Sequence, residues 1–124
     1  MKRLNDAELE QLNFENSEVT EMVVNPEGRA FLIRCNRADL IDGEAETSVD
    51  NVTLTIKDWS AVQARLFIDD EFKVVAAEDS QFFLTEVCEL SHEGGNTMIS
   101  GFSAQEGSWA DYTIEGGTFE VHTN

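Results

Sequence analysis

The chain has 124 residues, 41% of them hydrophobic, which is enough to bury the core of one globular domain. It carries 25 acidic residues against 8 Lys and Arg, giving a formal net charge of -17. Because nucleic acids and anionic membranes are bound through Lys and Arg, this charge excludes both as favourable partners.

The basic residues are confined to the first part of the chain. All eight lie at or before Lys73, and residues 74–124 contain nine acids and no Lys or Arg. The carboxylates of that segment must therefore face water, pair with cations of the first part, or meet a basic partner from outside.

The N-terminus and the cysteines indicate a compartment. Met1-Lys2-Arg3 is followed by Leu4-Asn5-Asp6-Ala7-Glu8 and not by an apolar core, and the longest strongly apolar stretches, such as 30–33, are far shorter than a membrane span. Cys35 and Cys88 form neither a CxxC pair nor a zinc motif, so we expect two buried thiols and no disulfide. These features predict a cytoplasmic protein.

The first predicted element is a short helix from Ala7 to about Leu12. Asn5 or Asp6 can cap it, and the acidic residues that follow lie favourably near its positive end. We expect a single domain, 1–124, in which 1–17 form a helical arm and 18–124 a β-rich core.

The clearest hairpin joins two strands at 19–24 and 29–34. Between them, Asn25-Pro26-Glu27-Gly28 places Pro at the second turn position and Gly28 where a left-handed conformation is expected. The pairing predicts one apolar face, which consists of Met22, Val24, Phe31 and Ile33.

The next segments differ in polarity. Asp42 to Asp50 is acidic and rich in turn residues, so we expect an exposed loop there. The strict alternation of apolar and polar residues over 51–57 predicts a strand with one solvent-exposed face. Residues 62–68 alternate in the same way, although a helix over 60–67 is the alternative because that segment contains good helix formers.

Two further strands are predicted at 72–77 and 82–90. The second has apolar residues at both odd and even positions, and therefore on both faces of the strand. This favours a central position in a sheet. Glu86 shares its parity with Leu84, so its carboxylate needs a cation or a raised pKa. The alternative is a bulge that turns Val87 toward the core.

Six of the eight glycines follow residue 93 and separate strands at 97–104, 109–115 and 118–123. Gly116-Gly117 predicts a tight turn that joins the last two strands in a hairpin. The whole pattern predicts an all-β fold, an antiparallel β-sandwich or small barrel of eight to nine short strands.

No motif for catalysis or for a cofactor stands out. His92 and His122 have no metal-ligand spacing, and the chain has neither a GxSxG elbow nor a phosphate-binding loop. We therefore expect no cofactor. Asp69-Asp70-Glu71 offers oxygen ligands for Ca²⁺ or Mg²⁺ if a second loop converges on it, but acidic runs of this kind are mostly solvated turns.

The segment 101–112 combines aromatic residues with acids around a polar loop. Rings supply rigid contact area and acids supply directed hydrogen bonds, as in interface hot spots and sugar-binding faces. The predicted binding residues are Glu89, Glu106, Trp109, Asp111 and Tyr112. The alternative is core packing, with Trp59 and Trp109 closing the two ends of a sandwich.

We therefore expect an interaction module, and no enzyme, whose acidic face docks onto a basic protein. In size and charge the chain resembles immunity proteins and inhibitors of basic nuclease toxins, which implies neutralisation by charge-complementary docking. The alternative is a small-molecule or carbohydrate-binding β-domain that uses Trp59, Trp109 and Tyr112. An enzyme ranks third. A homodimer formed through an uncovered strand edge is compatible with all three.

Overall fold

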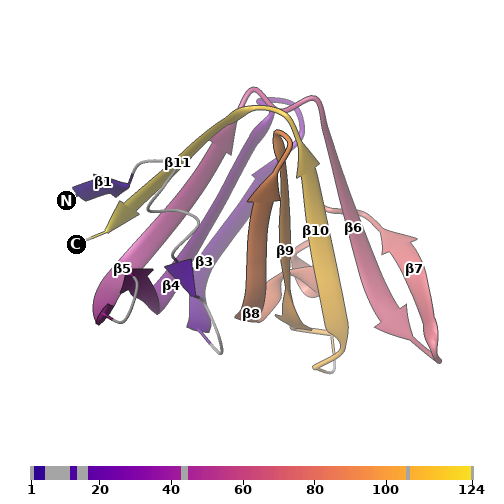
Figure 1. The fold of residues 1–124 in the computed structure, drawn as a ribbon. Coiled ribbons are helices and arrows are strands. Elements are labelled where there is room, and N and C mark those ends of the chain that lie inside the picture. The colour runs from indigo at the N-terminus through magenta and orange to yellow at the C-terminus, as the bar shows by residue number, and fades with distance from the viewer. Residues whose placement is uncertain (1, 5–11, 14–16, 43–44, 106, 124) are drawn as a thin grey trace.

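The fold is known from a computed structural model that describes residues 2–4, 12–13, 17–42, 45–105 and 107–123. Within these ranges the chain forms eleven strands and one 3-10 turn at Ser80–Phe82, and no α-helix (Figure 1). The strands are β1 (Lys2–Leu4), β2 (Leu12–Asn13), β3 (Ser17–Asn25), β4 (Ala30–Asp42), β5 (Ala45–Lys57), β6 (Ala61–Ile68), β7 (Glu71–Val75), β8 (Leu84–Glu93), β9 (Asn96–Ser103), β10 (Trp109–Glu115) and β11 (Thr118–Thr123). The predicted all-β character is confirmed.

All strand pairs are antiparallel, and they follow one another in the order β1-β11-β5-β4-β3-β8-β9-β10-β6-β7, with β2 paired to β4. We call β1-β11-β5-β4-β3 the β4 half and β8-β9-β10-β6-β7 the β10 half. They join where Ser17 pairs with Val87 and Glu18 pairs with Glu86. Figure 1 shows the two halves close together at one end and diverging toward the other, like the sides of a tent.

The core lies between the two halves. Strands of both halves contribute fully buried side chains, and the Phe31 ring of β4 lies 6.2 Å from the Tyr112 ring of β10. Alternation along each strand produces this arrangement, because every second residue points inward. Cys35 and Cys88 form no disulfide; Cys35 is buried in the core and Cys88 is half-buried. Burial raises the pKa of the Cys35 thiol to about 12.

The β3–β4 hairpin has the predicted apolar face, since Met22, Val24, Phe31 and Ile33 are all buried. Its turn differs from the prediction in one respect. The left-handed residue is Arg29, with φ 49°, and not Gly28. The side-chain oxygen of Asn25 accepts a hydrogen bond from the Gly28 N–H at 3.0 Å, so a closed turn spans Asn25 to Gly28. Asn25 pairs with Ala30 across the hairpin, so one more residue, Arg29, is needed to complete the connection.

The loop predicted from Asp42 to Asp50 is wrong. β4 and β5 are each 13 residues long and remain paired from Ala30 opposite Lys57 to Asp42 opposite Ala45. Backbone pairing along a long hairpin outweighs the low strand propensity of acidic residues, because that propensity depends on context.

The strand prediction for 62–68 is confirmed by β6, and the helical alternative is not seen. The hairpin predicted at Gly116-Gly117 is wrong. Both glycines have positive φ as expected, but β10 pairs with β6 and β9 whereas β11 pairs with β5 and β1. The turn therefore carries the chain from one half of the sheet to the other.

A second crossing, residues 58–60, runs beside this turn at the closed end of the tent (Figure 1). The Ser60 N–H donates to the Glu115 carbonyl at 2.8 Å, which ties the two crossings together. A side chain on Gly117 would place its Cβ 2.7 Å from the Lys57 carbonyl oxygen, so this close approach requires glycine.

The N-terminal prediction is tested only in part. Residues 5–11, which hold most of the predicted helix, lie outside the described ranges, while Leu12 belongs to the short strand β2. Strands β1 and β2 bring the number of strands above the predicted eight or nine. Both were missed because strands of two or three residues are too short to show an alternating pattern.

Candidate functional site

The outward-facing side of the β10 half exposes a set of large apolar side chains. Six large hydrophobic residues are exposed in the described ranges, and five of them belong to strands β6, β7 and β9. In β6 and β9 the residues on either side of these side chains are buried or half-buried, so by alternation Phe67, Met98 and Phe102 share the outer face. Phe72 and Val74 lie on the same face because they are opposite Phe67 and Arg65 of β6. We call this surface the aromatic face; it consists of Phe67, Phe72, Val74, Met98 and Phe102 together with the half-buried Trp109.

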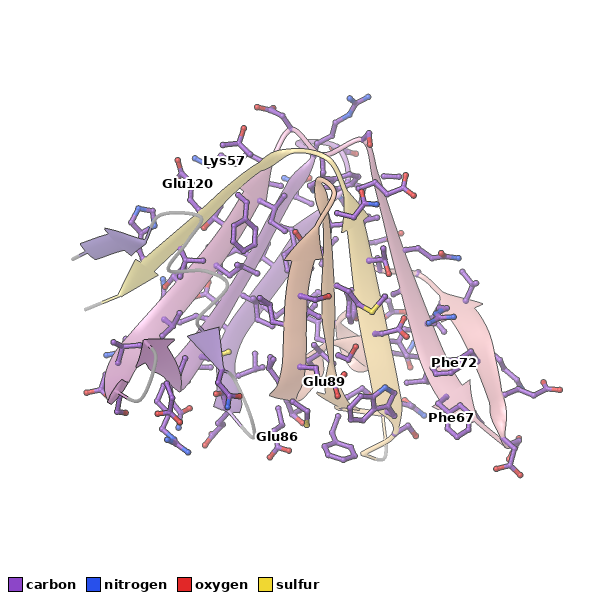
Figure 2. The ribbon with its side chains drawn as sticks, in the orientation of Figure 1. Lys57, Phe67, Phe72, Glu86, Glu89 and Glu120 are labelled. Atoms are coloured by element: carbon purple, nitrogen blue, oxygen red, sulfur yellow. The ribbon has the colours of Figure 1, made fainter. Side chains whose placement is uncertain are left out.

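The strand register arranges four of the rings in one row across the sheet. Phe72 is opposite Phe67, and Trp109 is opposite Phe102, while the Ala110–Leu66 pair brings Trp109 beside Phe67. The Phe67 and Phe72 ring centroids lie 5.0 Å apart, and those of Phe102 and Trp109 lie 5.5 Å apart in an edge-to-face arrangement. Figure 2 shows Phe67 and Phe72 side by side.

An ion pair lies next to this row. The Arg65 guanidinium donates two hydrogen bonds to the Asp111 carboxylate, at 2.9 and 2.6 Å, from the directly opposed position on β6. The hydrogen bond to Asp111 raises the pKa of Arg65; desolvation opposes this shift and the charge of Asp111 adds to it. Arg65 also lies over the Phe72 ring, 4.4 Å from its centroid. Arg65 therefore contacts both the buried Asp111 carboxylate and the Phe72 end of the row.

The acidic border of the aromatic face lies on β8. Glu86 is opposite Phe102, and Glu89 is opposite Ser100, so both carboxylates point to the outer side (Figure 2). Register shifts between Leu84 and Glu86 and between Val87 and Glu89 make this possible. The predicted bulge is thus confirmed, and Val87 is the residue that faces the core.

The bulge depends on a glycine in the neighbouring strand. A Cβ on Gly101 of β9 would lie 1.9 Å from the Glu86 carbonyl oxygen. Glycine therefore lets the backbones approach at the point where β8 turns its carboxylates outward. The Cys88 thiol, in the second bulge, donates to the Glu86 carboxylate at 3.6 Å.

The structure brings three of the five predicted binding residues to this face: Glu89, Trp109 and Asp111. Asp111 is buried there by Arg65 rather than open to a partner. Glu106 lies outside the described residues. Tyr112 does not lie on this face, because it follows Asp111 along β10 and so points inward.

Tyr112 belongs to the core. Its side chain is fully buried, and its hydroxyl donates to the Phe82 carbonyl at 2.8 Å. Burial raises the pKa of this hydroxyl, and the charge of Asp79 adds to the shift. Of the two tryptophans, Trp59 is buried in the core at the closed end, as the packing alternative predicts, while Trp109 is half-buried on the aromatic face.

Sequence reasoning missed Phe67, Phe72 and the role of Arg65, and it included Phe102 only as part of the aromatic segment 101–112. A signal for the first was present, since Phe67 has the polar parity of Gln63 and Arg65 in an otherwise regular alternating strand. An aromatic residue at an alternating position that faces solvent indicates a side chain that is exposed and does not pack in the core. The pairing of Arg65 with Asp111, 46 positions apart, requires the strand order.

The candidate metal ligands lie in a turn. Asp69 and Asp70 connect β6 to β7 with φ of 52° and 63°, and Glu71 begins β7. In the part of the chain that the structure describes, no three His, Cys, Asp or Glu residues gather closely enough to hold a metal ion. The positive φ of Asp69 and Asp70 fits a two-residue hairpin turn, because Asp tolerates the left-handed conformation.

No protein-family model, curated protein or solved structure matched this chain. The described ranges also contain no helix with the length and apolar character needed to cross a membrane.

Proposed function

We propose that the protein is a cytoplasmic interaction module that binds a basic protein through the aromatic face. The observation that carries this proposal is the row of four rings, bordered by carboxylates, on the open side of the β10 half. Aromatic side chains are the residues that interface hot spots favour, and exposed apolar surface is stabilised when a partner removes it from water.

Charge supports a basic partner. The row is flanked on β8 by Glu86 and Glu89, and at the β6–β7 turn by the acidic residues 69–71. The net charge of -17 attracts a cationic protein over distances of about a Debye length, and the rings then supply short-range affinity. Binding of this kind weakens as salt is added.

The geometry favours a protein over a small ligand. We take the two halves as the layers of a sandwich, because their inner faces share one core, and this leaves the aromatic face as an open sheet surface. A hollow on the same side, lined by Ala61, Gln63, Thr113 and Glu115, has a volume of about 130 Å³. Pockets for small molecules typically measure about 300–1,000 Å³. The edge-to-face rings of Phe102 and Trp109 also give no flat platform for a sugar.

The test compares the aromatic face with a matched position on the other half. Tagged wild-type protein captures partners from the lysate of its native host at about 50 mM and about 500 mM salt. The captured protein is then purified for calorimetry. We expect one basic protein, bound at low salt and weakened at high salt, with Phe67→Ser and Phe102→Ser each weakening binding about tenfold or more.

Val23→Ser is the control, because Val23 is exposed on the β4 half. It should bind like the wild type. The proposal fails if no stoichiometric partner is captured at either salt, or if Val23→Ser weakens binding as much as the two Phe variants. Saturable binding of a glycan, lost in Trp109→Ala, would instead establish the carbohydrate-binding alternative.

A further inference from the structure

The strand β7 ends the β10 half and has a partner on one side only. It pairs with β6, and no other described strand pairs with its second edge. Two of its side chains are strongly exposed, Phe72 at 47% and Val74 at 67%. An open edge of this kind offers its backbone groups to another strand.

The turn before β7 determines which backbone groups are open. Asp69 and Asp70 form a two-residue hairpin turn, so Ile68 and Glu71, which flank it, are the pair that exchanges backbone hydrogen bonds. Hydrogen-bonded and non-hydrogen-bonded pairs alternate from there along the ladder. The N–H and C=O groups of Phe72 and Val74 therefore point to the open side of β7.

The charges on β7 are self-complementary in one register. If Phe72 faces Phe72 of a second, antiparallel copy, Glu71 of each copy faces Lys73 of the other. Pairing Phe72 with Val74 would place the two Lys73 side chains opposite each other, and pairing Val74 with Val74 would create no ion pair. Opposite charges on directly facing residues stabilise a strand pair, and like charges destabilise it.

We propose that two copies of this chain form a two-fold symmetric dimer by antiparallel pairing of β7, with Phe72 opposite Phe72 and Glu71 opposite Lys73. The pairing joins the two β10 halves into one sheet and places the two aromatic rows end to end. It does not depend on the basic partner proposed above. Because each copy carries a charge of -17, mutual repulsion opposes the dimer and lowers its affinity.

A charge-swap experiment tests the register. Sedimentation velocity on the full chain, from about 1 to about 500 µM at about 150 mM salt, measures the dimer dissociation constant. We expect Glu71→Lys and Lys73→Glu each to raise that constant about tenfold, since each variant replaces two ion pairs with two like-charge pairs. The double variant Glu71→Lys/Lys73→Glu restores both pairs and should return to the wild-type constant.

Matched controls separate the register from net charge. Glu115→Lys and Lys57→Glu make the same changes in net charge at exposed positions away from β7 and should leave the dimer within about threefold of wild type (Figure 2 shows Lys57). Phe72→Pro removes the N–H that the central Phe72–Phe72 pair needs, without removing a hydrogen bond of the β6 ladder, so it should abolish the dimer while the monomer still melts cooperatively. A wild-type protein that is monomeric throughout, a double variant that is not rescued, or a Lys57→Glu effect as large as that of Lys73→Glu would overturn the proposal.

Discussion

Replacing Arg65 with alanine should destabilise the fold far more than a surface ion pair would suggest. The Asp111 carboxylate is only 5% exposed, and Arg65 supplies both of its hydrogen bonds across the strand pair. Removing one partner of a buried pair costs about 3–5 kcal/mol, because the other charge is left buried. The Arg65 side chain is itself 39% exposed, so water can enter after truncation. We therefore expect a loss of about 2–3 kcal/mol.

Arg34→Ala provides the matched control. Arg34 also pairs with an acid on the adjacent strand, Glu21, at 3.0 Å, but both side chains are nearly half exposed. An exposed pair contributes at most about 1 kcal/mol. Urea unfolding followed by tryptophan fluorescence should lower the midpoint by about 1–2 M for Arg65→Ala and by less than about 0.5 M for Arg34→Ala.

A double variant checks the stated cause. If the cost arises from the stranded Asp111 carboxylate, then Arg65→Met combined with Asp111→Leu should recover most of the lost stability, because no buried charge remains. Equal losses for Arg65→Ala and Arg34→Ala, or a double variant less stable than Arg65→Ala alone, would refute the reasoning.

Three further outcomes are expected. Gly101→Ala should lower the free energy of unfolding by about 2 kcal/mol or more, because its Cβ would overlap the Glu86 carbonyl, whereas Gly28→Ala, whose nearest contact is a flexible side chain, should cost less than about 1 kcal/mol; thermal melts compare them. Tyr112→Phe should cost about 1–2 kcal/mol in urea unfolding, since it leaves a carbonyl without its hydrogen bond. The folded pKa of Cys35 lies near 12, above its ordinary value of 9.0, so the folded state holds this proton more tightly and stability falls as pH rises above about 9, by up to about 1.4 kcal/mol per pH unit. Cys35→Ala should show a flatter dependence between pH 9 and 11 in the same assay, and an unchanged slope would contradict this assignment.

The sequence was sufficient to predict the strands with strong alternation. Residues 51–57 and 62–68 were correctly predicted as strands because each has a continuous inward set of apolar side chains. The bulge that turns Val87 inward was predicted as an alternative, since a carboxylate on an apolar parity is costly.

Local pattern failed where distant pairing determines the outcome. Gly116-Gly117 has the backbone of a hairpin turn, yet its two flanking strands lie in different halves, because β5 and β6 are already the partners of β11 and β10. The acidic run after Asp42 is a strand because a 13-residue partner lies beside it. The aromatic face was missed for the same reason, as its row of rings exists only once the order β9-β10-β6-β7 is known.

The seam between the two halves has a consequence for how the chain refolds. Ser17 pairs with Val87, 70 positions away, and Lys2 pairs with Thr123, whereas the β3–β4, β4–β5 and β8–β9 hairpins are local. Long-range pairs lose loop-closure entropy before their contacts form, so we expect the hairpins to form first and the seam last, over milliseconds to seconds. During that interval the apolar inner faces of the hairpins remain exposed to solvent, and the chain is prone to aggregate. The large negative charge then repels neighbouring chains until β3 and β8 of each chain have paired and joined its two halves.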